Sequence, residues 1–112
     1  MKRYCLAVDL KDDPALMEAY DRLHAPGSIW PEIKASILDS GILAMNIYRT
    51  GNRLFMIMET ADDFSFEAKA AMDRDNPAVQ RWETLMWDYQ QALPWAAPGE
   101  KWVLMDPIFE LK

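Results

Sequence analysis

His24 is the only histidine of the 112-residue chain, and it lies among side chains that can bind or move protons. Tyr20 precedes it by four residues, so the two side chains share one face of a helix. Trp30 and Glu32 follow within eight residues. Histidine can give and take a proton near neutral pH. The grouping indicates proton transfer on a small polar molecule, and a purely structural or solvated histidine is the alternative.

A second pair of interest is Trp82-Glu83. An aromatic face suits the C–H surface of a sugar ring, and a carboxylate suits its hydroxyl groups. The alternative is that Trp82 is a core residue and Glu83 a solvated flank. The chain contains no P-loop, no Gly-x-Ser-x-Gly and no Cys-x-x-Cys. One cysteine and one histidine cannot make an ordinary zinc site.

Composition narrows the class of protein. Twelve basic against 18 acidic residues give a net charge of −6, which disfavours nucleic acid and anionic membranes as partners. No run of apolar residues is long enough to span a bilayer, and the N-terminal residues lack the apolar core of a signal peptide. We therefore expect a cytoplasmic protein with one domain over residues 1–112.

Side-chain patterns predict the elements that position these residues. Residues 3–10 are typical of a strand. A helix is expected over 14–24, because Asp13 can cap its first amides and Pro14 suits its first position. A second helix is expected from residue 31 to 38 or 39, ended by glycine.

Two strands, 42–50 and 53–60, are separated by Gly51-Asn52, which favours a tight hairpin. Helices are expected over 62–73 and 78–91, a loop over 92–99 and a last strand over 101–105. The order is that of a ferredoxin-like βαββαβ fold of the α+β class, with one antiparallel sheet and helices on one face.

The hairpin register assigns its side chains to two faces. The face expected beneath the helices carries Met45, Ile47, Arg49, Leu54, Met56 and Met58. The opposite face carries Ala44, Asn46, Tyr48, Phe55, Ile57 and Glu59. Because Tyr48, Phe55 and Ile57 would be left uncovered, we expect a homodimer.

The pattern Tyr-x-x-x-His, a short spacer and Ile-Trp-Pro-Glu (residues 29–32) resembles the L-rhamnose mutarotase family. Gly41, the strand ending Ile47-Tyr48, Leu54-Phe55 and Gln80-Arg81-Trp82 extend the resemblance over nearly the whole chain. The resemblance implies a mutarotase-like domain in a dimeric α/β barrel. It also implies interconversion of the α and β anomers of a 6-deoxy sugar without a cofactor.

The resemblance also implies roles for three residues. His24 aligns with the proton-donating histidine of the family, and Tyr20 with its first substrate-contacting tyrosine. Trp82 aligns with a tryptophan of the last helix. Beside Trp82, we expect Glu83 to bind hydroxyls or to act as the complementary base.

Two positions depart from the family pattern. A second sugar-contacting tyrosine is replaced by Met45, and the second tryptophan of a Trp-Trp pair by Glu83. Losing one hydroxyl and gaining a carboxylate should redirect hydroxyl recognition. L-Fucose is therefore the expected substrate, with Met45 or Met58 offering an apolar wall for its methyl group.

The sequence is also compatible with three other functions. The chain could be an L-rhamnose mutarotase proper. It could be a dimeric α+β barrel protein that binds haem, with His24 as an axial ligand, or another small molecule. It could also be a non-catalytic dimeric interaction protein.

Overall fold

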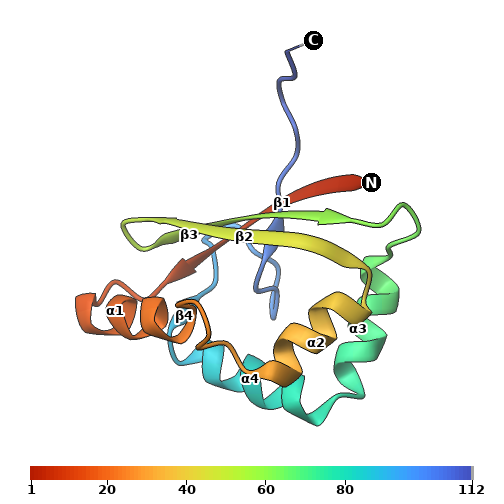
Figure 1. Ribbon diagram of the computed structural model, residues 1–112. Helices are drawn as coiled ribbons and strands as arrows, with labels where there is room; N and C mark the ends of the chain where they lie inside the picture. The colour runs from red at the N-terminus through yellow and green to blue at the C-terminus, as the bar shows by residue number, and fades with distance from the viewer. Residues whose placement is uncertain (112) are drawn as a thin grey trace.

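The computed structural model describes residues 1–111 as one antiparallel sheet with four helices against one face (Figure 1). Its elements are β1 (Lys2–Leu10), α1 (Pro14–Leu23), α2 (Pro31–Asp39), β2 (Ile42–Thr50), β3 (Arg53–Thr60), α3 (Phe66–Arg74), α4 (Pro77–Trp87), β4 (Gln90–Gln91) and β5 (Val103–Leu104). The strand order is β2-β3-β1-β4, and β5 also pairs with β1. This is the predicted ferredoxin-like α+β fold, with each connecting helix doubled.

The β2–β3 hairpin has the predicted register, in which Met45 lies opposite Met58 and Ile47 opposite Met56. Gly51 has a φ of +55°, which suits glycine in a two-residue hairpin loop. The register shifts between Ile42 and Ala44. Since a bulge adds one residue to one strand, Ile42 and Met45 can both face the helices although they are three residues apart.

The predicted bounds of three elements are wrong by two residues or more. The third helix begins at Phe66 rather than at residue 62, because the Ser65 side chain caps it by accepting from the amide of Ala68. The last helix ends at Trp87 rather than at residue 91, because Gln90 and Gln91 form β4 and pair with β1 instead. The last strand is confined to 103–104, where it pairs with β1.

The first helix also ends one residue before the predicted boundary, and His24 is its C-cap. The helices and the inner face of the sheet enclose two groups of buried apolar residues. One group lies around Leu10, Leu54 and Trp82, and the other around Ile42, Met56 and Phe64. Within the described residues, no helix combines the length and apolar character needed to cross a membrane.

Candidate active site

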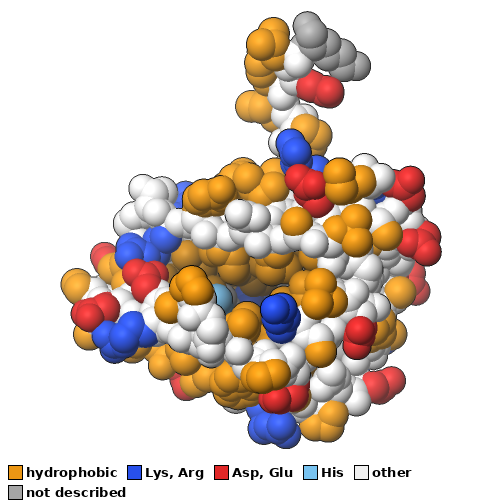
Figure 2. Space-filling view, in the orientation of Figure 1, with side chains coloured by type: hydrophobic (Ala, Val, Ile, Leu, Met, Phe, Trp, Pro, Cys, Tyr) orange, Lys and Arg blue, Asp and Glu red, His pale blue; other side chains and the backbone are white. Residues whose placement is uncertain are grey.

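A cavity of about 340 Å³ lies between the sheet and the helices. Its walls are largely apolar, and its opening and the pale-blue histidine inside it are visible in Figure 2. The residues predicted to form the site all line this cavity: Tyr20, His24, Met45, Trp82 and Glu83. They come from α1 and its C-cap, β2 and α4, so the fold brings together positions up to 63 residues apart in sequence. An apolar cavity with a few convergent polar groups is typical of a small-molecule site.

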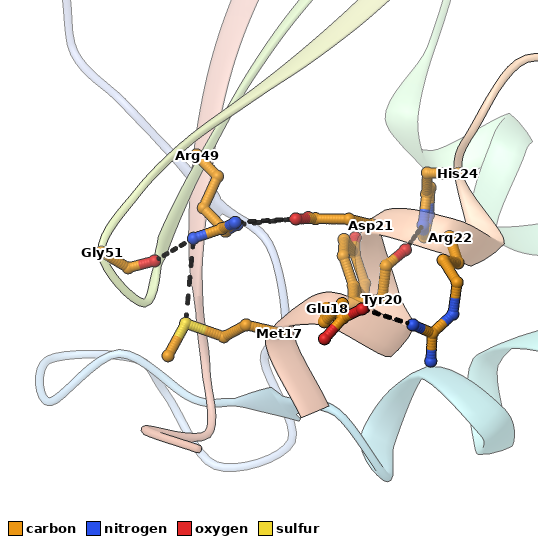
Figure 3. Close-up of polar contacts among 8 residues, drawn as sticks. All are labelled: Met17, Glu18, Tyr20, Asp21, Arg22, His24, Arg49 and Gly51. Atoms are coloured by element: carbon orange, nitrogen blue, oxygen red, sulfur yellow. Dashed lines mark hydrogen bonds and ion pairs between the residues drawn. The ribbon is translucent and has the colours of Figure 1, made fainter. Parts of the chain in front are cut away.

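Tyr20 and His24 are held by α1. Asp13 accepts hydrogen bonds from the amides of Ala15 and Leu16 at 2.9 and 3.3 Å and so caps the first turn. At the other end, Nδ1 of His24 lies 2.9 Å from the carbonyl oxygen of Tyr20 (Figure 3). The two rings stack with centroids 4.1 Å apart. The predicted four-residue spacing therefore places the rings in direct contact.

The contact of His24 with the Tyr20 carbonyl determines which ring nitrogen is free. A carbonyl oxygen only accepts, so Nδ1 carries the hydrogen of this bond and Nε2 of the neutral ring is a proton acceptor. Burial lowers the pKa of His24 below its ordinary value of 6.5, and the hydrogen bond to Tyr20 and the charge of Asp21 oppose this effect only in part. At neutral pH the ring is therefore uncharged and able to take a proton.

The Tyr20 hydroxyl is buried and protonated. Burial raises its pKa to about 12, while a hydrogen bond from Gln90 acts in the opposite direction. That bond joins Nε2 of Gln90 to the Tyr20 oxygen at 3.3 Å. Tyr20 thus serves as a neutral hydrogen-bonding group at the cavity wall.

Trp82 is a core residue as well as a cavity residue. It is 7% exposed, which agrees with the core interpretation, yet it also lines the cavity. Its ring meets His24 and Trp30 edge to face, with centroids 5.5 and 5.0 Å apart. Trp30 therefore packs against Trp82 and supports the wall that carries His24. Glu32, at the start of α2, is exposed.

Glu83 is held by a residue that the sequence patterns did not indicate. Lys101 donates to a Glu83 carboxylate oxygen at 2.5 Å and to the Glu83 carbonyl at 3.1 Å. The Lys101 side chain is only 10% exposed, whereas that of Glu83 is 46% exposed. The ammonium also lies 4.8 Å from the ring centroid of Trp87. Glu83 is therefore a fixed carboxylate at the cavity, and not simply a solvated flank.

The β2–β3 hairpin also contacts α1, through an ion pair between Arg49 and Asp21. Arg49 donates from Nε and Nη2 to the two carboxylate oxygens of Asp21 at 3.2 and 2.7 Å, and from Nη1 to the Gly51 carbonyl at 2.9 Å. Figure 3 shows this contact one helical turn before His24. A bidentate pair fixes geometry as well as distance, so it orients the helix that carries the candidate acid–base group.

Gln90 and Lys101 also line the cavity, and the sequence did not predict a role for either of them. Gln90 fell inside the predicted last helix, and Lys101 at the start of the predicted last strand. No motif or spacing in the sequence links either residue to His24. In the part of the chain that the structure describes, no cluster of three or more His, Cys, Asp or Glu residues could hold a metal ion.

Comparison with known proteins decides the family. The L-rhamnose mutarotase family model matches residues 3–111. The chain belongs to the L-rhamnose mutarotase family. An L-fucose mutarotase from Xanthomonas campestris pv. campestris is 48% identical over 111 residues, covering 99% of this chain and 89% of the relative.

Two further relatives are less similar to this chain than the Xanthomonas protein is. An L-rhamnose mutarotase from Phocaeicola vulgatus is 35% identical over 91 residues, covering 80% of this chain and 76% of the relative. The crystal structure of an L-rhamnose mutarotase from Formosa agariphila superposes with a TM-score of 0.72 at 21% identity, over all of both chains. That structure confirms the fold, and the family assignment makes this chain a sugar mutarotase.

Proposed function

We propose that this protein interconverts the α and β anomers of a 6-deoxy hexose without a cofactor, and that it favours L-fucose over L-rhamnose. The observation that carries the proposal is the meeting of His24, Tyr20 and Glu83 in one largely apolar cavity. Support for the sugar comes from the relative named L-fucose mutarotase, which is 48% identical, whereas the relative named L-rhamnose mutarotase is 35% identical.

Mutarotation requires proton movement at two oxygens of the same carbon. In the proposed mechanism, Nε2 of His24 takes the proton of the anomeric hydroxyl as the C1–O5 bond breaks and C1 becomes an aldehyde. The imidazolium then gives that proton to O5, so His24 acts first as base and then as acid. Rotation about C1–C2 and the reverse sequence close the ring on the other face. General acid–base assistance of this kind contributes about 10²–10⁴-fold.

The remaining cavity residues would hold the sugar. The neutral Tyr20 hydroxyl would orient it, and Trp82 would offer an apolar surface to its ring. Glu83, fixed by Lys101, would accept hydrogen bonds from hydroxyl groups. Met45 would contact the methyl group at C5. L-Fucose and L-rhamnose differ in configuration at C2 and C4, so an acceptor at a fixed place can distinguish them.

We also propose that the protein is a homodimer. Tyr48 is 57% exposed on the sheet face that the helices leave open, and it lies opposite Phe55 in the hairpin. A second copy would cover this face and close the barrel. A cytoplasmic location also stays a prediction.

Anomer exchange tests the function directly. Saturation-transfer NMR with L-fucose, L-rhamnose and common aldoses measures the rate at which each anomer is converted into the other. We expect enzyme-dependent exchange that is fastest for L-fucose. Faster exchange of L-rhamnose would contradict the roles given to Met45 and Glu83, and no exchange of any sugar would contradict the proposed function.

A further inference from the structure

Gln90 presents a buried acceptor that the mechanism above does not use. The residue is 3% exposed, and it is fixed in β4 opposite Leu10 of β1. The residue is one of those that line the cavity. Within residues 1–111, its Oε1 has no hydrogen-bond partner. Buried side-chain oxygens normally accept a hydrogen bond. A molecule bound in the cavity could supply the donor that this oxygen lacks.

The Gln90 amide also determines the direction of the hydrogen bonds that the Tyr20 hydroxyl can make. Its Nε2 donates to the Tyr20 hydroxyl at 3.3 Å, so the tyrosine oxygen accepts from the protein and its own hydrogen is left to donate. Because the pKa of Tyr20 is raised to about 12, that hydrogen is present throughout the neutral range. Gln90 and Tyr20 together offer one acceptor and one donor, fixed relative to each other.

We propose that Gln90 is a substrate-binding residue that determines specificity, with its Oε1 accepting a hydrogen bond from one sugar hydroxyl while Tyr20 donates to a sugar oxygen. The inference rests on the proposed function and names a further contact in the same site. A vicinal diol of a pyranose supplies the two complementary groups. A sugar that lacks the contacted hydroxyl would leave Oε1 buried without a donor, and it should be strongly disfavoured.

The matched variants are Gln90→Met and Gln91→Met. Both change glutamine to a side chain of similar length in β4, but Gln91 is exposed and pairs with Asp9. Anomer exchange is measured on L-fucose and on its 2-, 3- and 4-deoxy derivatives. In the wild type, kcat/KM should fall at least about 10-fold for one deoxy sugar. Gln90→Met should lower kcat/KM for L-fucose by about 10–100-fold and abolish that selective penalty. Gln91→Met should behave as wild type.

A third variant separates substrate contact from support of Tyr20. Gln90→Glu keeps an acceptor at the same place, so it should retain the preference for the hydroxylated sugar that Gln90→Met loses. Equal losses on all four sugars in Gln90→Met would show that Gln90 only supports Tyr20, and would overturn the inference. Absence of exchange in the wild type would instead refute the proposed function itself.

Discussion

The chemistry of His24 is set by one backbone atom and by burial. The Tyr20 carbonyl holds the Nδ1 hydrogen, and burial keeps the ring neutral, so Nε2 is the free acceptor. A histidine at the same sequence position in an exposed loop would lack both features. The residue types alone therefore indicate proton transfer. The local structure adds that neutral His24 would begin by accepting a proton at Nε2.

Replacing His24→Gln removes the titrating group and keeps a polar side chain. We expect exchange of L-fucose to fall by about 10²–10⁴-fold, the usual contribution of general acid–base catalysis. Saturation-transfer NMR gives the rate, and circular dichroism verifies that the variant is folded. Wild-type exchange in a folded variant would show that His24 does not move the proton.

The pH dependence follows from the two perturbed groups. His24 must be neutral to take the first proton, and burial lowers its pKa. We therefore expect kcat/KM to rise with pH toward a plateau, and the midpoint of this rise should lie below pH 6.5. Tyr20, with a pKa of about 12, should add no alkaline decline below pH 10. A midpoint above 6.5, or an acidic limb that survives in His24→Gln, would contradict this assignment.

At the scale of elements, α1 depends on its first turn. Asp13 satisfies two amides that have no partner within the helix. Changing Asp13→Ala should lower the free energy of unfolding by about 1 kcal/mol. Urea denaturation measures the change, and Asp12→Ala, at an exposed neighbouring position outside the cap, is the control. An equal loss in both variants would exclude a capping role.

The segment before β5 acts on α4 through one ion pair. Because Lys101 holds the Glu83 carboxylate at 2.5 Å, Lys101→Met should let that carboxylate turn into solvent. We expect KM for L-fucose to rise about 10-fold, with a smaller change in kcat. Lys34→Met, at an exposed position of α2, is the control. A fall in kcat at unchanged KM would place Lys101 in the proton-transfer step instead.

Sequence periodicity predicts the elements that pack locally and fails where the chain makes distant pairings. The hairpin register and the Tyr20–His24 contact follow from local spacing. The end of α4 does not, because Gln90 joins β1 across 80 residues and this pairing overrides the helical pattern. For the same reason Gln90 and Lys101 were missed, since each reaches the cavity from a segment whose sequence gives no sign of it.

The whole molecule has one covered and one uncovered sheet face. All four helices lie on one side, and the segment after β5 extends away on the other (Figure 1). That segment carries three strongly exposed apolar residues, Ile108, Phe109 and Leu111. A monomer would present this apolar surface to water together with Tyr48 and its strand neighbours, which disfavours the monomeric state.

The proposed dimer can be tested on the uncovered face without touching the cavity. Tyr48→Asp introduces a charge where two copies would meet, and burying an unpaired charge is costly. We expect the wild type to sediment with twice the mass of one chain and Tyr48→Asp to sediment as a monomer. Met72→Asp, a comparable change on α3 at 43% exposure, should remain dimeric.

Because the proposed acid–base group and Glu83 belong to one chain, a folded Tyr48→Asp monomer should keep exchange activity. A wild type that sediments as a monomer at micromolar concentration would refute the dimer, and an inactive monomer would show that the partner copy completes the site.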